Sequence, residues 1–151
     1  MGNVISNYAK GRFIEWASLP AGGDNLIVVL FKAAGLPADA TLIDCQFLSD
    51  VFTAGAVQAD FTNWARKVLS AVDITITVNT TTNIATLDIA DQTWASAGGA
   101  TNNPLGKFGL FYRKTSSDAD TAIRCMTFHD FVVTTTGVNL SAVVPSIGTA
   151  T

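Results

Sequence analysis

The sequence predicts a mainly β protein, an antiparallel β-sandwich or small barrel with one short inserted helix at about residues 44–54. Short alternating or β-branched segments recur at hairpin spacing, which is typical of such folds. A helical pattern occurs with comparable clarity only in that one insert. The 151 residues suit one domain. We therefore expect a flexible N-terminal arm over residues 1–11, a single β-rich domain over 12–144 and a flexible C-terminal tail over 145–151.

A β-hairpin is the strongest local signal. In DITITV, residues 73–78, isoleucine and valine alternate with threonine, and ATLDI, residues 85–89, alternates in the same way. The polar stretch NTTTN separates the two segments. Because side chains alternate between the faces of a strand, this pattern predicts one buried and one polar face.

Other strands are expected on both sides of the hairpin. Residues 12–17 alternate, with Phe13 and Glu15 on one side and Ile14 and Trp16 on the other. Residues 26–33 are largely apolar and show no alternation, which predicts a strand covered on both faces, although a short amphipathic helix would also explain them. The remaining expected strands cover residues 107–113, 122–134 and 140–144, with an extended segment over 61–72.

The inserted helix has both of its boundaries marked. Asp44 is a possible N-cap, and four apolar residues between positions 47 and 52 fall on one helical face. Gly55 follows the last apolar residue and ends the pattern.

The composition points to a component of an assembly. Apolar residues make up 48% of the chain and charged residues only 14%, whereas roughly a quarter is usual for charged residues. No apolar run approaches the ~20 residues that a membrane span needs, so no membrane is expected as a partner. The net charge of −3 and the scattered basic residues argue against nucleic-acid binding, which needs clustered lysine and arginine.

The sequence contains no convincing catalytic arrangement, and we do not expect an enzyme. The single histidine, His129, precedes Asp130, but neighbours in a strand point to opposite faces, so Asp130 cannot orient it. Cys125 would share the face of His129 at a separation of roughly 13 Å, too far for a nucleophile and its base. Cys45 and Cys125 are too few for a disulfide framework or a zinc site and are expected as buried small hydrophobes.

No cofactor or metal is expected either. The loop around Asp118 and Asp120 lacks the third ligand and the glycine spacing of a calcium loop. Gly98 and Gly99 lack the lysine and the following helix of a phosphate-binding loop.

Four segments together resemble a known family. They are NYAKGRFIEW (7–16), LIVVLFKAAGLPADATLIDC (26–45), ADFTNWARKVL (59–69) and DQTWASAGGATNNPLGK (91–107). They resemble small structural proteins of tailed bacteriophages, over roughly residues 7–110. The resemblance implies a virion protein, most like a capsid decoration (cement) protein, made in the bacterial host cytoplasm and bound to the capsid surface.

Such decoration proteins often bind as trimers and stabilise contacts between subunits of the major capsid protein. Another virion component, such as a tail, neck or fibre-associated adaptor, is an alternative, and a carbohydrate-binding β-sandwich is a further one. Trp16 and Trp64, in extended apolar segments, are expected in the core. Trp94 lies ahead of small residues and is equally compatible with core and interface. The candidate partner-contact residues are Val4, Ile5, Tyr8, Arg12, Trp94, Asn102 and Asn103.

Overall fold

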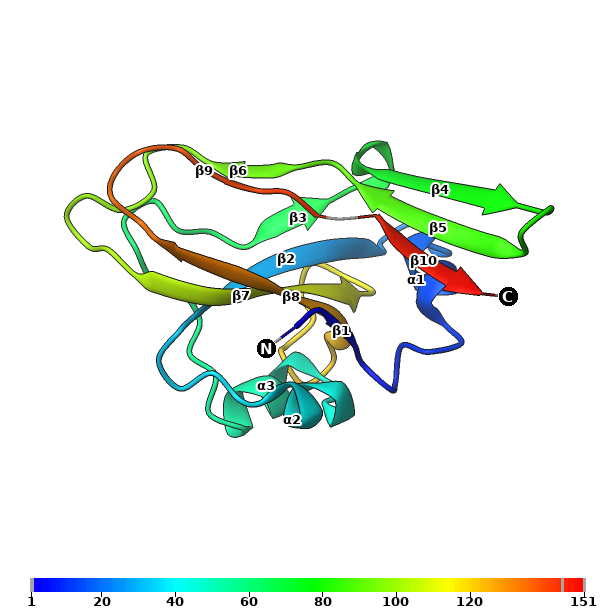
Figure 1. Ribbon diagram of the computed structural model, residues 1–151, viewed down its shortest axis with the longest axis horizontal. Helices are drawn as coiled ribbons and strands as arrows, with labels where there is room; N and C mark the ends of the chain where they lie inside the picture. Colours follow the sequence, from blue (N-terminus) through cyan, green and yellow to red (C-terminus); the bar gives the residue numbers. More distant parts are fainter. Residues whose placement is uncertain (1, 145, 151) are drawn as a thin grey trace.

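A five-stranded antiparallel sheet forms the middle layer of the molecule (Figure 1). The computed structural model describes residues 2–144 and 146–150. The strands of this sheet, in spatial order, are β1 (Val4–Ile5), β8 (Arg124–Thr134), β7 (Pro104–Arg113), β2 (Asn25–Lys32) and β3 (Lys67–Leu69).

Smaller elements cover both faces of this sheet (Figure 1). One face packs against a three-stranded sheet, a two-stranded sheet and helix α1, and the other against α2 and α3. The covering elements are α1 (Phe13–Ala17), α2 (Asp39–Asp44), α3 (Leu48–Thr53), the 3-10 turn η1 (Ala71–Asp73), and strands β4 (Ile74–Asn79), β5 (Ile84–Ile89), β6 (Gln92–Trp94), β9 (Leu140–Ala142) and β10 (Ile147–Ala150). The predicted fold class, a mainly β and sandwich-like domain with few helices, is confirmed.

Strands β2 and β7 are buried on both faces. The six central residues of β2 are fully buried, and their side chains alternate between two hydrophobic clusters. Leu30 and Leu110 lie in the cluster beneath the smaller sheets, whereas Val29 and Phe111 lie in the cluster beneath α2 and α3. The unbroken apolar run of β2 therefore is a doubly covered strand, and the alternative of a helix is wrong.

The predicted hairpin is confirmed, but its apolar face is fully buried only on β5, since Ile74 and Ile76 are half-buried and Val78 is exposed. Strands β4 and β5 pair in register from Ile74 opposite Ile89 to Asn79 opposite Ile84. Ala85, Leu87 and Ile89 are buried, and the intervening threonines of β4 are exposed. β10 pairs with the other edge of β5.

The expected helix at residues 44–54 is shorter and begins later. α3 begins at Leu48, and the Asp50 carboxylate accepts hydrogen bonds from the backbone N–H groups of Gln46 and Phe47 (3.0 and 2.9 Å). Asp44 is the last residue of α2 rather than an N-cap, because Cys45 has an extended conformation that separates the two helices. Gly55 follows the helix at φ +110°, as its position predicted.

Residues 12–17 form no strand. Phe13, Trp16 and Ala17 lie on one side of helix α1 and are buried in the core. Their spacing of three and four residues fits one helical face as well as the alternating pattern fits a strand, and packing against the sheet selects the helix.

The N-terminal segment lies against the domain instead of forming a free arm. β1 pairs with β8, placing Val4 opposite Phe128 and Ile5 opposite Thr127. Ser6 is buried and its hydroxyl donates to the Cys45 carbonyl at 2.7 Å. The C-terminal segment adds β10, and Pro145 and Thr151, the ends of the expected tail, lie outside the described residues.

Lys107 supplies a fully buried ammonium group between β7, β8, α2 and the N-terminal segment. Its Nζ bonds to Asp130 and to the Gly2 carbonyl (2.6 Å) and lies 3.1 Å from the Asp39 carboxylate. The Gly2 N–H donates to the other Asp39 oxygen at 2.6 Å. This hydrogen bond and the Lys107 charge hold the pKa of Asp39 below its usual value.

Replacing Lys107 with methionine should destabilise the fold, because it leaves two partly buried carboxylates without their cation. We expect the free energy of unfolding to fall by about 2 kcal/mol, below the usual cost of breaking a buried pair since Asp39 and Asp130 retain some solvent contact. Urea denaturation measures this loss, with Lys10→Met at an exposed lysine as the control. Equal stability of the two variants would contradict the role assigned to Lys107.

Candidate functional site

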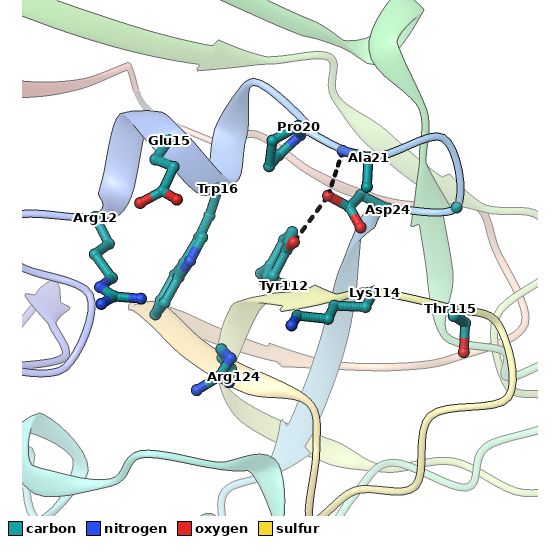
Figure 2. A pocket seen from close by; sticks show the side chains of 11 residues that line it. Arg12, Glu15, Trp16, Pro20, Ala21, Asp24, Tyr112, Lys114, Thr115 and Arg124 are labelled. Carbon is teal, nitrogen blue, oxygen red and sulfur yellow. Dashed lines mark hydrogen bonds between the residues drawn. The ribbon is translucent and has the colours of Figure 1, made fainter.

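A hollow of about 500 Å³ lies between helix α1, the loop that follows it, and the adjoining ends of β7 and β8 (Figure 2). It is built from two parts of the chain that are distant in the sequence, residues 12–24 and the paired ends of β7 and β8. The lining residues are Arg12, Glu15, Trp16, Pro20, Ala21, Gly23, Asp24, Tyr112, Lys114, Thr115 and Arg124.

The inner wall of the hollow is an aromatic pair. The rings of Trp16 and Tyr112 stack with centroids 5.5 Å apart and planes inclined by 4°. The Tyr112 hydroxyl donates to an Asp24 carboxylate oxygen at 2.8 Å, and the Ala21 N–H donates to the same oxygen at 2.8 Å (Figure 2). Burial, together with Asp24, raises the pKa of Tyr112 to about 12, so the phenol stays neutral and holds the loop of Asp24 to the sheet.

Arg124 is held in place by three aromatic rings. Its guanidinium carbon lies 5.4 Å from the centre of the Tyr8 ring, 5.8 Å from that of Trp16 and 5.6 Å from that of Phe47. One of its N–H groups also donates to the Tyr8 hydroxyl. Cation–π contacts of this kind orient the guanidinium plane without neutralising its charge.

Two further cations, Arg12 and Lys114, lie at the rim of the hollow and are exposed. Neither forms an ion pair within the described part of the chain, although Glu15 also lines the hollow. Three of the nine basic residues of the chain therefore line one hollow, with two carboxylates beside them. The basic residues are scattered in the sequence, but the fold gathers these three.

The candidate contact residues of the N-terminal segment divide between this hollow and the sheet edge. Arg12 lines the hollow, and Tyr8 contacts its Arg124. Val4 and Ile5 are half-buried in the edge strand β1 and pack against the two hydrophobic clusters on opposite faces of the sheet instead.

Trp94 is a core residue. Its side chain is 2% exposed and stacks on Trp64 with ring centroids 5.8 Å apart. The indole N–H donates to the Ala65 carbonyl at 2.8 Å, and the Lys67 ammonium lies 5.3 Å from the ring centre. The question left open by the sequence is answered by this burial, and Trp94 is not displayed to a partner.

Asn102 and Asn103 anchor the loop before β7. The Asn102 side-chain oxygen accepts from the Gly99 N–H at 2.8 Å, while the side chain as a whole stays exposed. Asn103 is buried, and its amide group exchanges hydrogen bonds with the backbone and carboxylate of Asp60 (2.8 and 2.9 Å). A partner can therefore contact Asn102 on the surface of this loop, but not Asn103.

His129 and Cys125 lie on opposite faces of the sheet, so the expectation that they share a face is wrong. Leu110 pairs with Thr127 and the next residue of β7 pairs with Cys125, so Met126 is an extra residue that reverses the alternation. His129 is 3% exposed and stacks on Phe108 at 4.7 Å. Its Nε2 lies 2.9 Å from the Thr127 hydroxyl, and its Nδ1 has no hydrogen-bond partner among the described residues.

The described residues contain no group of three or more histidine, cysteine or acidic side chains that could hold a metal ion. Asp118 accepts hydrogen bonds from the backbone of Lys114 and Thr115, and Asp120 forms a two-pronged ion pair with Arg66. None of the helices in the described part is long and apolar enough to cross a membrane.

Glu15, Lys114 and Arg124 are site residues that the sequence did not predict. They come from α1, the end of β7 and the start of β8, and no spacing along the chain connects them. The only available signal was the scarcity of basic residues, which makes any spatial cluster of them informative.

Comparison of the chain with protein-family models, with curated proteins and with solved structures finds no significant match.

Replacing Trp94 with alanine should lower the stability of the isolated protein. Removing a buried indole leaves a cavity and an unpaired Ala65 carbonyl, so we expect a loss of about 3–4 kcal/mol. Chemical denaturation of the purified protein measures it, and Trp94→Phe, which keeps most of the packing, should lose less. A loss below about 1 kcal/mol for Trp94→Ala would contradict the core assignment.

Stability should decrease as the pH falls from 7 to 5 because of His129. Burial, and then the Lys107 charge, lowers the pKa of His129 to about 4, whereas it is near 6.5 in an unfolded chain. The unfolded chain takes up a proton in this range and the folded chain does not, which costs about 2 kcal/mol. Denaturation at several pH values should show this slope, and His129→Gln should remove it, since the chain has no other histidine. The same slope in both proteins would contradict the assignment.

Proposed function

We propose that this chain is a structural virion protein that binds the outside of a bacteriophage capsid and stabilises contacts between capsid subunits. The sequence motifs support the proposal through their resemblance to small phage structural proteins. The observation that carries it is the distribution of exposed apolar side chains over the surface.

Eight large hydrophobic side chains among the described residues are exposed, and four of them lie on the outside of the elements that cover one face of the central sheet. These four lie in or beside η1 and strands β5 and β9. They are Val72, Ile84, Val138 and Val143. We call this set the valine face. A concentration of exposed apolar side chains is typical of a protein-binding surface.

Some of the few charges are also engaged within the molecule. Lys32 pairs with Asp60, Arg66 pairs with Asp120, and Lys107 is buried between carboxylates. A surface with few charged residues and exposed β-branched side chains suits a broad, lasting contact better than recognition of a polyanion.

A capsid-binding assay tests the proposal. Purified protein added to capsids of its phage that lack it should bind in a fixed number of copies at symmetric positions, seen by cryo-electron microscopy. The bound capsids should disassemble at a higher temperature. Because Val72 is 91% exposed, Val72→Asp should weaken binding by about tenfold without unfolding the chain.

Val132→Asp is the matched control. Val132 is 84% exposed in β8, outside the valine face, and its substitution should leave capsid binding unchanged. Density confined to the tail or neck of the virion would favour the adaptor alternative. Equal loss of binding in both variants would contradict the role of the valine face.

A further inference from the structure

The hollow beside α1 has a charge pattern that selects for a single negative charge. Arg12, Lys114 and Arg124 oppose Glu15 and Asp24, so three cations and two carboxylates give the lining a net charge of +1. One carboxylate group on a ligand balances the net charge of +1. A doubly charged phosphate would instead leave one negative charge unbalanced beside Glu15 and Asp24. The planar guanidinium groups also match the geometry of a carboxylate.

The Arg124 guanidinium is already held in position without a ligand. Its three ring contacts and its bond to Tyr8 fix the guanidinium at the hollow, so little side-chain freedom is lost on binding. A guanidinium has five N–H donors, and Tyr8 occupies only one of its terminal nitrogens.

Asp24 and Glu15 differ in their availability. One oxygen of Asp24 already accepts from Tyr112 and Ala21, so this carboxylate belongs to the wall. Glu15 is exposed beside the cations, and its charge opposes an incoming anion. Removing the Glu15 charge should therefore strengthen anion binding.

The aromatic wall argues against a sugar ligand. Trp16 and Tyr112 are only 3% and 4% exposed, because their faces stack on each other. A sugar ring needs an exposed aromatic face, and this wall does not offer one. The exposed cations at the rim are instead accessible to a side chain carried by an extended polypeptide.

We infer that this hollow binds one aspartate or glutamate side chain presented by an extended segment of a partner protein. The hollow shares no residue with the valine face, so the inference goes beyond the capsid proposal and does not need a capsid for its test. Failure of the peptide test below leaves the capsid-binding result unaffected, and the reverse also holds.

The test is a titration of the isolated protein with the peptide Gly-Glu-Gly, acetylated and amidated so that the glutamate carboxylate is its only charge. NMR spectra should show saturable shifts at Arg12, Lys114 and the Trp16 indole N–H, with millimolar affinity. The twin peptide Gly-Gln-Gly should cause no such shifts. Equal effects of the two peptides, or the absence of shifts at the hollow, would overturn the inference.

Charge variants at exposed positions sharpen the test, because unchanged spectra elsewhere in the chain verify that each one folds. The variants Arg12→Gln and Lys114→Gln should each bind the Gly-Glu-Gly peptide at least about threefold more weakly. Glu15→Gln should strengthen it by about the same factor, and Lys10→Gln, an exposed lysine outside the hollow, should change nothing. Weaker binding by Glu15→Gln, or equal losses in the Lys10 and Arg12 variants, would contradict the site.

Two other anions separate the ligand classes. Inorganic phosphate and glucuronate should each bind more weakly at the hollow than the Gly-Glu-Gly peptide does. Tighter binding of phosphate than of the peptide would assign the site to phosphorylated ligands, and tighter binding of glucuronate would assign it to acidic sugars. Either result would overturn a protein carboxylate as the occupant.

Discussion

Strand β7 is buried on both faces, and every other layer of the molecule has to be in place around it. Leu110 requires the smaller sheets above it and Phe111 requires α2 and α3 below it. The same strand also carries Lys107, whose charge cannot be left alone in the interior. Its partners come from α2, β8 and the N-terminal segment, so one ammonium group connects the elements that cover this part of the sheet.

The hollow is a consequence of the same packing. Helix α1 covers the sheet beside the end of β7, where Trp16 stacks on Tyr112, and its preceding residue Arg12 is carried to the rim. The start of β8 supplies Arg124, which three rings hold in place. Aromatic packing thus closes the core at this end and orients a cation toward solvent. The arrangement combines a packed aromatic wall with exposed charges, which suits recognition of a small anionic group.

Two surfaces of different chemistry follow from this architecture. The valine face offers apolar contact area and little charge, whereas the hollow offers a small positive excess. Broad apolar contact contributes most to affinity, and charge contributes most to orientation and partner choice. In a capsid-bound protein, the valine face would contribute most of the binding affinity and the hollow would fix the orientation of the bound protein.

The local sequence pattern alone determined those elements whose pattern is compatible with only one secondary structure. The alternation in residues 73–89 allows only a hairpin with one buried face, and the helix ending before Gly55 has its apolar stripe in the sequence. Where the pattern was compatible with both a helix and a strand, tertiary packing decided. Residues 13–17 form a helix because Phe13 and Trp16 then pack together against the sheet. Trp94 became core because Trp64 and the Ala65 carbonyl meet it. The hollow could not be predicted from the sequence, since Arg12 lies more than a hundred residues from Lys114 and Arg124 and only the folded sheet brings them together.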